Sequence, residues 1–475
     1  MDVLIIGCGI AGATTALELA KSKKRVTIIT RSDIFDSNST CAQGGIVSRG
    51  KHDSKESLSR DIFRAGRGLS DKKAVEILAV EGPKLVDRIL VDELGIRFDA
   101  DFGLEAAHST KRILHVADAT GKVVMEALLA ALKSYKNVKW LTYHTAMDLV
   151  IEGGECQGVL VFDQKQKRVK KLLSGSTVLA TGGVGQLFLY TTNPAGARGD
   201  GLAMAYRAGA DIENAEYVQF HPTALANPGR VKFLISEALR GEGGRLKTPG
   251  GALFDDLAPR DVLSQQIYTE MLSNNYPYVL LDIASYRTPK FIRQRFPTIY
   301  RHCKSRGIDI TRDSIPVVPV AHYFCGGVKV DLWGRTNIMG LYAVGEVTCT
   351  GLHGANRLAS TSLLEGLVWG VRAALDITRQ QTPRRVDGDV SFLQDSLRTA
   401  DLAVIRRKMQ RIRKLMWECV GLKQDRSLLE KGVIRLEDLR KDIEEIYRDS
   451  RLTDSLIGLR NSAESALVIA RARLS

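Results

Sequence analysis

Four short stretches of the sequence concentrate histidine, arginine and acidic residues beside glycines. An arginine guanidinium pairs with a carboxylate through two parallel hydrogen bonds, and histidine can add a further one. Several such groups together predict a site for a small dicarboxylate. The spacing of Cys and His resembles no metal site, and no serine stands in a nucleophile elbow. The stretches are residues 105–112, 219–223, 236–261 and 322–327 joined to 351–365.

Each of these residues also has a purely structural interpretation. A single histidine in a globular chain is commonly a hydrogen-bonded core residue. Arg240 and Arg260 are equally consistent with ion pairs inside the fold. The clusters by themselves therefore leave both interpretations open, and the other motifs of the chain are needed to decide.

A glycine-rich turn near the start of the chain predicts a dinucleotide site. Residues 3–6 are a continuous apolar run, residues 13–21 have helical character, and residues 26–29 are a second apolar run. Between the first two, the glycines allow a tight turn, a close backbone approach to a pyrophosphate, and close packing of strand on helix. The helix N-terminus then offers free N–H groups to phosphates. The predicted contacts are Gly7, Cys8, Gly9, Ile10, Ala11 and Gly12.

The choice between FAD and NADP depends on later residues. An acidic residue usually ends the second strand and holds a ribose hydroxyl, but here Thr30 is followed by Arg31. Arg31 is consistent with a phosphate or adenine contact, with NADP, or with a surface position. Residues 340–346 favour FAD, because this strand ending in Gly-Glu is similar to one in flavoproteins, where the carboxylate (here Glu346) meets the ribityl chain. The loop 42–46 suits a flat ring, or is an ordinary glycine loop.

Composition predicts an ordinary globular protein. The 475 residues are 44% hydrophobic and 26% charged, with a net charge of +14. The basic residues are spread along the chain, without the aromatic-interleaved stripe of a nucleic-acid-binding protein, so an RNA-modifying flavoprotein is only a rival interpretation. Seven cysteines without a CxxC pair indicate a reducing compartment. With neither a signal peptide nor a membrane-spanning apolar run, we expect a cytoplasmic protein without membrane insertion.

A change of composition over 215–322 and helical periodicity beyond 390 predict three units. Helices are expected near 71–94 and 120–135, strands over 138–173 with the basic run 165–171 at a hairpin tip, and helices beyond 390. The expected fold is an α/β Rossmann-like FAD-binding domain with an inserted α+β capping domain and a C-terminal helical bundle. We assign residues 1–214 and 323–390 to the FAD-binding domain, 215–322 to the capping domain, and 391–475 to the C-terminal helical domain.

The motifs, in their order along residues 1–370, resemble the succinate dehydrogenase/fumarate reductase flavoprotein family. Residues 350–360 are similar to the signature of its branch that oxidises an amino dicarboxylate, whereas respiratory members usually carry two glycines after the leucine. The motifs are the glycine turn, Gln43-Gly44-Gly45, His221-Pro222-Thr223, Arg240-Gly241-Glu242-Gly243, Pro259-Arg260-Asp261, His322-Tyr323 and His353-Gly354-Ala355-Asn356-Arg357-Leu358.

The resemblance implies FAD-dependent oxidation of L-aspartate to iminoaspartate, with O₂ (giving H₂O₂) or fumarate as electron acceptor. The product would feed quinolinate and NAD synthesis, which makes a quinolinate synthase a candidate partner. A soluble fumarate reductase or succinate dehydrogenase flavoprotein is the alternative. Members with covalent FAD carry a histidine five residues before the motif glutamine; Asn38 stands there, so the resemblance implies non-covalent FAD.

The resemblance also implies roles for individual residues. Arg260 is expected to shuttle the proton, with Glu237 and Arg240 as its relay, and Glu105 to lie near the substrate ammonium. The implied substrate-binding residues are Glu105, Gln219, His221, Ser236, His322, Arg357 and Ser360. Besides the glycine turn, the implied FAD contacts are Thr30, Arg31, Asn38, Ser39, Thr40, Cys41, Ala42, Gln43, Gly44, Gly45, Asp200, Glu346, Ser362 and Leu363.

Overall fold

A parallel sheet forms the centre of the first domain in this computed structural model, which describes residues 1–475 except 257, 381–389, 393–398 and 424. Its five strands lie in the order β16-β9-β1-β2-β5. All four residues of β1 are buried, as expected for a parallel strand covered on both faces. The strands are β1 (Val3–Ile6), β2 (Val26–Thr30), β5 (Val138–Thr142), β9 (Ser176–Leu179) and β16 (Leu341–Ala343).

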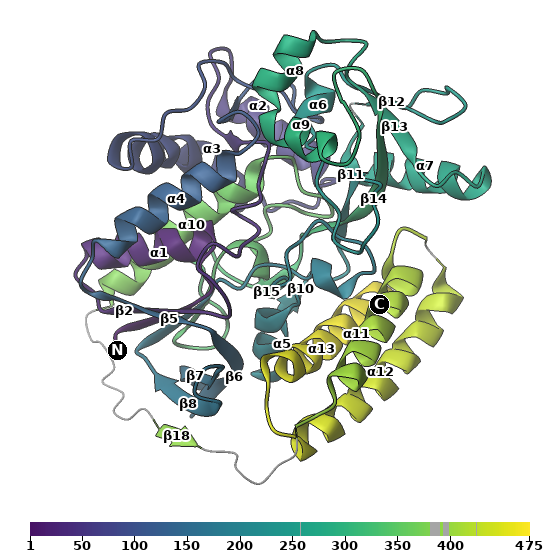
Figure 1. The fold of residues 1–475 in the computed structure, drawn as a ribbon. Coiled ribbons are helices and arrows are strands. Elements are labelled where there is room, and N and C mark those ends of the chain that lie inside the picture. Colours follow the sequence, from purple (N-terminus) through teal and green to yellow (C-terminus); the bar gives the residue numbers. More distant parts are fainter. Residues whose placement is uncertain (257, 381–389, 393–398, 424) are drawn as a thin grey trace.

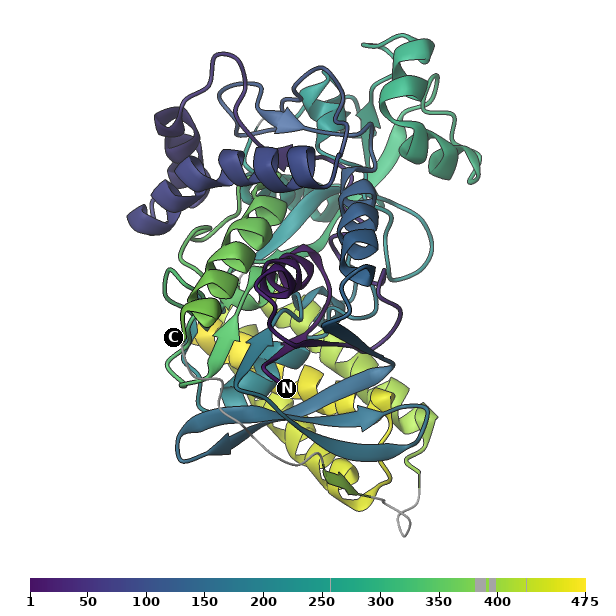
Figure 2. The same ribbon diagram turned by 90° about the vertical axis from the view of Figure 1, so that its left-hand side faces the viewer.

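Helices cover one face of this sheet and a second sheet covers the other (Figure 1, Figure 2). The helical side consists of α1 (Ile10–Lys21), α4 (Thr120–Lys133) and α10 (Thr361–Arg379). The second sheet contains β6 (His144–Glu152), β7 (Glu155–Asp163) and β8 (Arg168–Leu173). The predicted hairpin tip is confirmed in part, because β7 ends before the basic run but β8 already begins at Arg168.

The helix expected near 71–94 changes its winding after a proline. Helix α3 (Lys72–Leu85) contains Pro83, and a π-helix (Val86–Glu93) continues it. Proline cannot donate the hydrogen bond of an α-helical turn, and local π turns are one way to absorb such a defect. Other elements of this domain are α2 (Lys55–Ala65), β3 (Ile46–Val47), β4 (Ile113–Leu114), α5 (Asp200–Arg207), β10 (Ile212–Glu213), β15 (Gly327–Lys329) and β17 (Thr348–Cys349), with 3-10 turns at Gly185–Leu187 and Gly345–Val347.

The segment between the two halves of the first domain builds its own sheet and core, at the top of Figure 1. The antiparallel order is β11-β14-β13-β12, so the long strands β11 (Val218–Leu225) and β14 (Ile315–Phe324) pair beside the first domain. The remaining elements are β12 (Arg245–Lys247), β13 (Val279–Asp282), α6 (Ala238–Gly241), α7 (Arg260–Ser273), α8 (Pro289–Arg295) and α9 (Pro297–Lys304).

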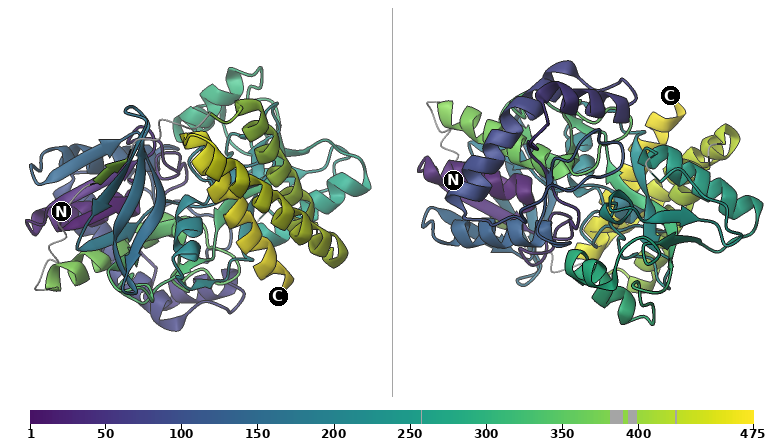
Figure 3. Two further views of the ribbon diagram at one scale, coloured as in Figure 1. Left: turned by 90° about the horizontal axis from the view of Figure 1, so that it is seen from below. Right: turned by 90° about the horizontal axis from the view of Figure 1, so that it is seen from above.

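Three long helices end the chain: α11 (Leu402–Leu415), followed by a π-helix (Met416–Val420), α12 (Arg426–Asp449) and α13 (Asp454–Leu474). They pack beside the β6-β7-β8 sheet (Figure 3) and share a core with Phe188 and Phe220. The domain boundary predicted at 390/391 falls inside β18 (Val390–Phe392), which pairs with β8. Residues 381–389 and 393–398 on either side of this strand lie outside the described residues. Within the described chain, no helix is both long and apolar enough to span a bilayer.

Helices α1 and α10 approach closely because α10 carries Gly366 and Gly370 at the contact. A Cβ atom added at Gly370 would lie 2.9 Å from the carbonyl oxygen of Ala11. A Cβ atom at Gly366 would lie 2.8 Å from the side chain of Ile10. Both contacts are with α1, the helix that follows the glycine turn. The position of that turn therefore depends on the small residues of α10.

We expect Gly370→Val to lower the free energy of unfolding by about 1–3 kcal/mol, because the added atoms push α10 away from the backbone of α1. Urea unfolding monitored by circular dichroism measures the change. The matched control places the same residue on the same helix at the exposed Leu375: Leu375→Val should change stability by less than about 0.5 kcal/mol. Equal effects of the two substitutions would contradict close packing at Gly370.

Candidate active site

One continuous cavity of about 800 Å³ runs from the glycine turn to the capping domain. Its size is typical of a site for a large ligand. Most of the residues predicted from the sequence line it. The exceptions are Gly12, Gln219 and Arg240, which lie behind its wall. Of these, Gln219 was predicted to contact the substrate and Arg240 to act in the relay behind Arg260, and their contacts are described below.

The glycine turn is shaped by close backbone contacts. Gly7 has φ +106°, and a Cβ atom there would lie 2.1 Å from the carbonyl oxygen of Ala180. Gly12 faces inward, with its virtual Cβ 2.3 Å from the oxygen of Gly7, so it serves packing rather than ligand contact. The N-terminus of α1 opens onto the cavity, where Ile10 N donates to Ser39 Oγ at 3.0 Å. Such a helix N-terminus favours a pyrophosphate.

Glu346 and Asn38 form a polar pair in the cavity wall. Asn38 Nδ2 donates to Glu346 Oε2 at 2.8 Å, and the backbone N–H of Phe324 donates to Oε1 at 3.1 Å. Burial raises the pKa of Glu346 to about 7. Among the described residues, the buried oxygens Asn38 Oδ1 and Gln43 Oε1 have no hydrogen-bond partner within the protein. These unsatisfied oxygens fit a ligand that donates hydrogen bonds, as the hydroxyl and ring N–H groups of FAD do.

The far end of the cavity holds the residues expected near the adenosine. Thr30 Oγ1 donates to the carbonyl oxygen of Ser32 at 2.8 Å. Arg31 contacts two carboxylates, those of Asp36 and Asp454. Because these carboxylates already balance its charge, the geometry disfavours a 2′-phosphate and therefore NADP. Asp200 also lines this end, but its carboxylate accepts hydrogen bonds from Arg198 and Asn461.

The loop of residues 38–45 follows the cavity between these two ends. Gly44 touches the acidic side chain of Glu105, since a Cβ atom there would lie 2.2 Å from Glu105 Oε1. The first turn of α10 meets the loop from the other side, and Ser362 and Leu363 line the cavity there. Ser360 precedes this helix without capping it through its side chain, so the first N–H groups of α10 are available to a ligand.

Two histidines from neighbouring strands stand at the substrate end. The rings of His221 and His322 lie 4.9 Å apart, edge to face. Burial and the nearby Arg260 lower both pKa values well below the usual value, so both rings are neutral. The backbone N–H of Thr223 donates to His221 Nδ1, which must therefore accept. The proton of the neutral His221 ring accordingly lies on Nε2, ready to donate to a carboxylate.

Buried arginines surround these histidines. Arg260 Nη1 and Arg357 Nη2 both donate to Gln219 Oε1, at 3.0 and 3.3 Å. Gln219 thus spaces the two guanidinium groups from behind instead of binding substrate directly. Burial and Arg260 lower the pKa of Arg357, which is the effect of an uncompensated positive charge. An anionic ligand would relieve this charge. Ser236, whose Oγ accepts from Ala238 N at 3.2 Å, lines the same end.

A chain of charges leads from Arg260 away from the cavity. Arg260 Nε donates to Glu237 in a short contact, and Arg240 Nη2 lies 3.5 Å from the other oxygen of Glu237. Burial opposes ionisation of Glu237, but Arg260 and Arg240 outweigh it and lower its pKa. Arg240 does not line the cavity and Glu237 does. The three residues therefore form a line in which only Arg260 and Glu237 can meet a ligand.

Glu105 is a buried carboxylate within this cationic region. Ser360 Oγ donates to its Oε2 at 2.6 Å. Burial and the neighbouring Glu237 raise its pKa. A cationic group of a ligand would stabilise the ionised form of Glu105. The cavity therefore has a place for an ammonium group as well as for carboxylates.

Sequence reasoning did not identify two sets of cavity residues. Thr192, whose Oγ1 lies 2.7 Å from His322 Nδ1, orients that ring, but an isolated threonine carries no recognisable motif. The second set is a group of basic side chains at the capping-domain end of the cavity. Within the described residues, Lys122 is the one side chain of this group that forms an ion pair, with Glu126 at 3.8 Å. Such a group raises the local concentration of an anionic ligand. Its members are Lys122, Lys232, Arg301, His302 and Arg306.

The class of protein follows from a family model and from solved structures. Residues 2–363 match the family model described as FAD binding domain. A solved quinol fumarate reductase chain from E. coli superposes with a TM-score of 0.88 at 26% identity, over 99% of this chain and 88% of that chain. The cofactor is therefore FAD, and the predicted fold class, a Rossmann-like FAD-binding domain with a capping domain and a C-terminal helical bundle, is confirmed.

Sequence relatives give the narrower assignment. L-aspartate oxidase 1 of Ralstonia nicotianae is 42% identical over 100% of this chain and 93% of its own length. L-aspartate oxidase of Halobacterium salinarum is also 42% identical, over 99% of this chain and 93% of its own length. The chain belongs to the L-aspartate oxidase family, and the resemblance found in the sequence is confirmed.

His108 supports the loop that carries Glu105. Arg112 Nη1 donates to His108 Nδ1 at 3.1 Å, so Nε2 carries the proton and donates to the carbonyl oxygen of Ala359 at 3.0 Å. Burial, with a contribution from Arg112, lowers the pKa of His108 to about 4. The histidine therefore links the Glu105 loop to the residue before Ser360, and it does so in its neutral form.

We expect acidification to destabilise the protein through His108. Its pKa is depressed in the folded state, so its contribution is fully present above about pH 6.5 and is lost as pH falls toward 4. Between pH 7.5 and 5.5 this amounts to about 1.4 kcal/mol. His108→Gln should reduce the pH dependence of the unfolding free energy, measured by urea titration at both pH values. An unchanged dependence in the variant would contradict a neutral, buried His108.

Proposed function

We propose that the protein oxidises L-aspartate to iminoaspartate with non-covalent FAD and passes the electrons to O₂ or fumarate. The observation that carries the proposal is the combination of Arg260, Arg357 and two neutral histidines with the buried carboxylate of Glu105 in one cavity. The cations match the two acid groups of aspartate, and Glu105 matches its ammonium. The identity of the relatives supports the same substrate.

Residues of this chain would hold FAD in the first part of the cavity. The α1 N-terminus would hold the pyrophosphate, Glu346 and Asn38 the ribityl hydroxyls, and the 43–45 loop with the α10 N-terminus the ring. Asn38 carries an amide, which donates to Glu346 and offers no nucleophile for a covalent link, in agreement with non-covalent binding. Bound FAD supplies a hydride acceptor that is afterwards reoxidised.

The protein's own contribution to catalysis is orientation and charge. Arg357 and the histidines bind the two carboxylates and so fix the orientation of the substrate carbon relative to the flavin ring. Such orientation lowers the activation barrier by several kcal/mol. The capping domain brings the two histidines, Ser236 and Arg260 over Glu105 and Arg357 of the first domain, which excludes water. When fumarate is the acceptor, Arg260 donates the proton, and Glu237 and Arg240 pass the replacement along the buried line.

The decisive experiment is anaerobic titration of the purified yellow protein with L-aspartate. We expect the flavin absorbance to bleach and to return when O₂ or fumarate is added. Bleaching with succinate but not with L-aspartate would instead support the alternative, a soluble fumarate reductase or succinate dehydrogenase flavoprotein. The structural likeness to quinol fumarate reductase favours this second candidate only at the level of shared fold and cation cluster.

Arg260→Ala should lower the rate of fumarate reduction by at least about 10²–10⁴-fold, the usual range for loss of a proton donor, while FAD remains bound. Stopped-flow reoxidation of the reduced enzyme by fumarate measures the rate, and flavin absorbance measures occupancy. Arg245→Ala is the control, since Arg245 is an exposed arginine of the capping domain that pairs with Asp256 outside the cavity. An Arg260→Ala enzyme that still reduces fumarate would refute this role.

Glu105→Gln should weaken aspartate oxidation more than fumarate reduction, because only aspartate has an ammonium group to pair with the carboxylate. We expect kcat/KM for L-aspartate to fall about 10–100-fold, as for loss of a buried charge-assisted hydrogen bond. Fumarate reduction by the same variant is the internal control. Equal losses with both substrates would count against the ammonium contact.

The product chemistry suggests a further partner. An imine of a dicarboxylate hydrolyses in water, so direct use by a quinolinate synthase would protect it, and this route would lead to quinolinate and NAD. The docking of such an enzyme, like the cytoplasmic location, stays a prediction. Co-purification of the two proteins, or a higher quinolinate yield when both are present than when one is added later, would test it.

A further inference from the structure

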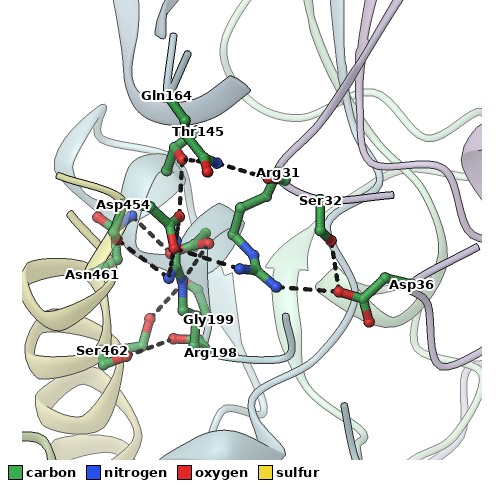
Figure 4. Close-up of polar contacts among 12 residues, drawn as sticks. Arg31, Ser32, Asp36, Thr145, Gln164, Arg198, Gly199, Asp454, Asn461 and Ser462 are labelled. Carbon is green, nitrogen blue, oxygen red and sulfur yellow. Dashed lines mark hydrogen bonds and ion pairs between the residues drawn. The ribbon is translucent and has the colours of Figure 1, made fainter. Parts of the chain in front are cut away.

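Arg31 lies at the adenosine end of the cavity between two carboxylates from distant parts of the chain (Figure 4). Its Nη2 lies 3.3 Å from Asp36 Oδ2, and its Nη1 lies 3.5 Å from Asp454 Oδ2. Asp36 lines the cavity two residues before the loop of residues 38–45. Asp454 belongs to the first turn of α13, in the C-terminal bundle. The C-terminal bundle thus places one carboxylate, that of Asp454, against Arg31 of the cofactor site.

The carboxylate of Asp454 is fixed independently of Arg31. Arg198 donates to both of its oxygens, at 2.8 and 3.2 Å, and Thr145 Oγ1 donates to Oδ1 at 2.9 Å. Burial opposes ionisation of Asp454, but Arg198 outweighs it and lowers the pKa of the carboxyl. The helix N-terminus favours the same negative charge. Asp454 is therefore an ionised carboxylate whose orientation does not depend on the side chain it directs.

The surroundings of Arg198 show that this placement is built into the packing of α13. A Cβ atom at Gly458 would lie 2.2 Å from Arg198 Nη1, so only glycine leaves room for the guanidinium. Ser462 Oγ donates to the carbonyl oxygen of Arg198 at 3.2 Å, and Ser465 Oγ donates to that of Gly199 at 2.8 Å. Figure 4 shows Ser462 of α13 beside Arg198. The two serine hydrogen bonds hold α13 in register with the cavity wall.

We propose that Asp454 is a positioning residue for the cofactor: it orients Arg31 toward the adenosine half of FAD, and through it the C-terminal bundle sets FAD affinity. Arg31 has five N–H donors in a rigid fork, and two carboxylates determine which edge remains free for the ligand. Loss of the Asp454 charge leaves Arg31 with Asp36 alone, so the fork is no longer fixed in one orientation. The proposal rests on FAD as cofactor and not on the identity of the substrate.

The test measures FAD release from the holoenzyme by flavin fluorescence on serial dilution. We expect Asp454→Asn to raise the dissociation constant of FAD about tenfold, which corresponds to about 1.4 kcal/mol. Arg31→Gln should raise it by at least as much, and the double variant should be no weaker than Arg31→Gln alone. Asp454→Glu, which keeps the charge, should recover part of the affinity. Additive effects of Arg31→Gln and Asp454→Asn would overturn the proposal.

Asp148 offers a matched control that separates an effect on FAD binding from a general effect on how the C-terminal bundle packs against the first domain. Like Asp454 it is a partly exposed aspartate that joins an arginine of the first domain, Arg207, to the bundle, here through Arg460 of α13. Its partner Arg207 does not line the cavity, whereas Arg31 does. Asp148→Asn should lower the thermal midpoint as Asp454→Asn does, while FAD affinity changes less than twofold. If both variants weaken FAD binding equally, Asp454 acts only through stability and the proposal fails.

Discussion

The site depends on one constraint: two buried guanidinium groups, Arg260 and Arg357, are held near each other with less negative charge than they need. Their shared acceptor, Gln219, is neutral, and Glu237 is itself divided between Arg260 and Arg240. An arrangement of like charges in a low-dielectric region costs free energy. The protein tolerates this cost because the ligand supplies the missing carboxylates. Binding strength and selectivity for a dicarboxylate therefore have the same origin.

The fold keeps these charges in place by anchoring each one to a different unit. Arg357 and Glu105 belong to the FAD-binding domain, while Arg260 begins α7 in the capping domain. The sheet strands β11 and β14 carry the two histidines side by side, because their pairing brings residues 221 and 320 opposite each other. At the other end of the cavity, α13 reaches Arg31. The first two units supply the charges that line the cavity and the third holds Arg31 through Asp454, so the site is complete only when all three are docked.

Local sequence patterns predicted the parts of this arrangement that local chemistry determines. The glycine turn, the parallel strands and the long C-terminal helices follow from spacing and periodicity within a few residues. Gln219, for which the resemblance implied a substrate contact, lies behind the cavity wall, since motif position does not tell the wall of a cavity from the residue behind it. The contact between Arg31 and Asp454 joins residues 423 positions apart, and no spacing rule reaches that far. The π-helix after Pro83 was likewise invisible to a helical period.

The charge balance explains how one cavity can serve both an amino acid and a fumarate-like acceptor. Fumarate brings two negative charges, and with Glu105 protonated the ligand and this residue together carry a charge of about −2. Aspartate brings two carboxylates and an ammonium, and with Glu105 ionised the same sum is reached. The raised pKa of Glu105 makes both protonation states accessible, because burial and Glu237 oppose its ionisation until a cation arrives. Arg260 and Arg357 thus meet the same total charge with either ligand, and the proton on Glu105, next to Ser360, makes up the difference.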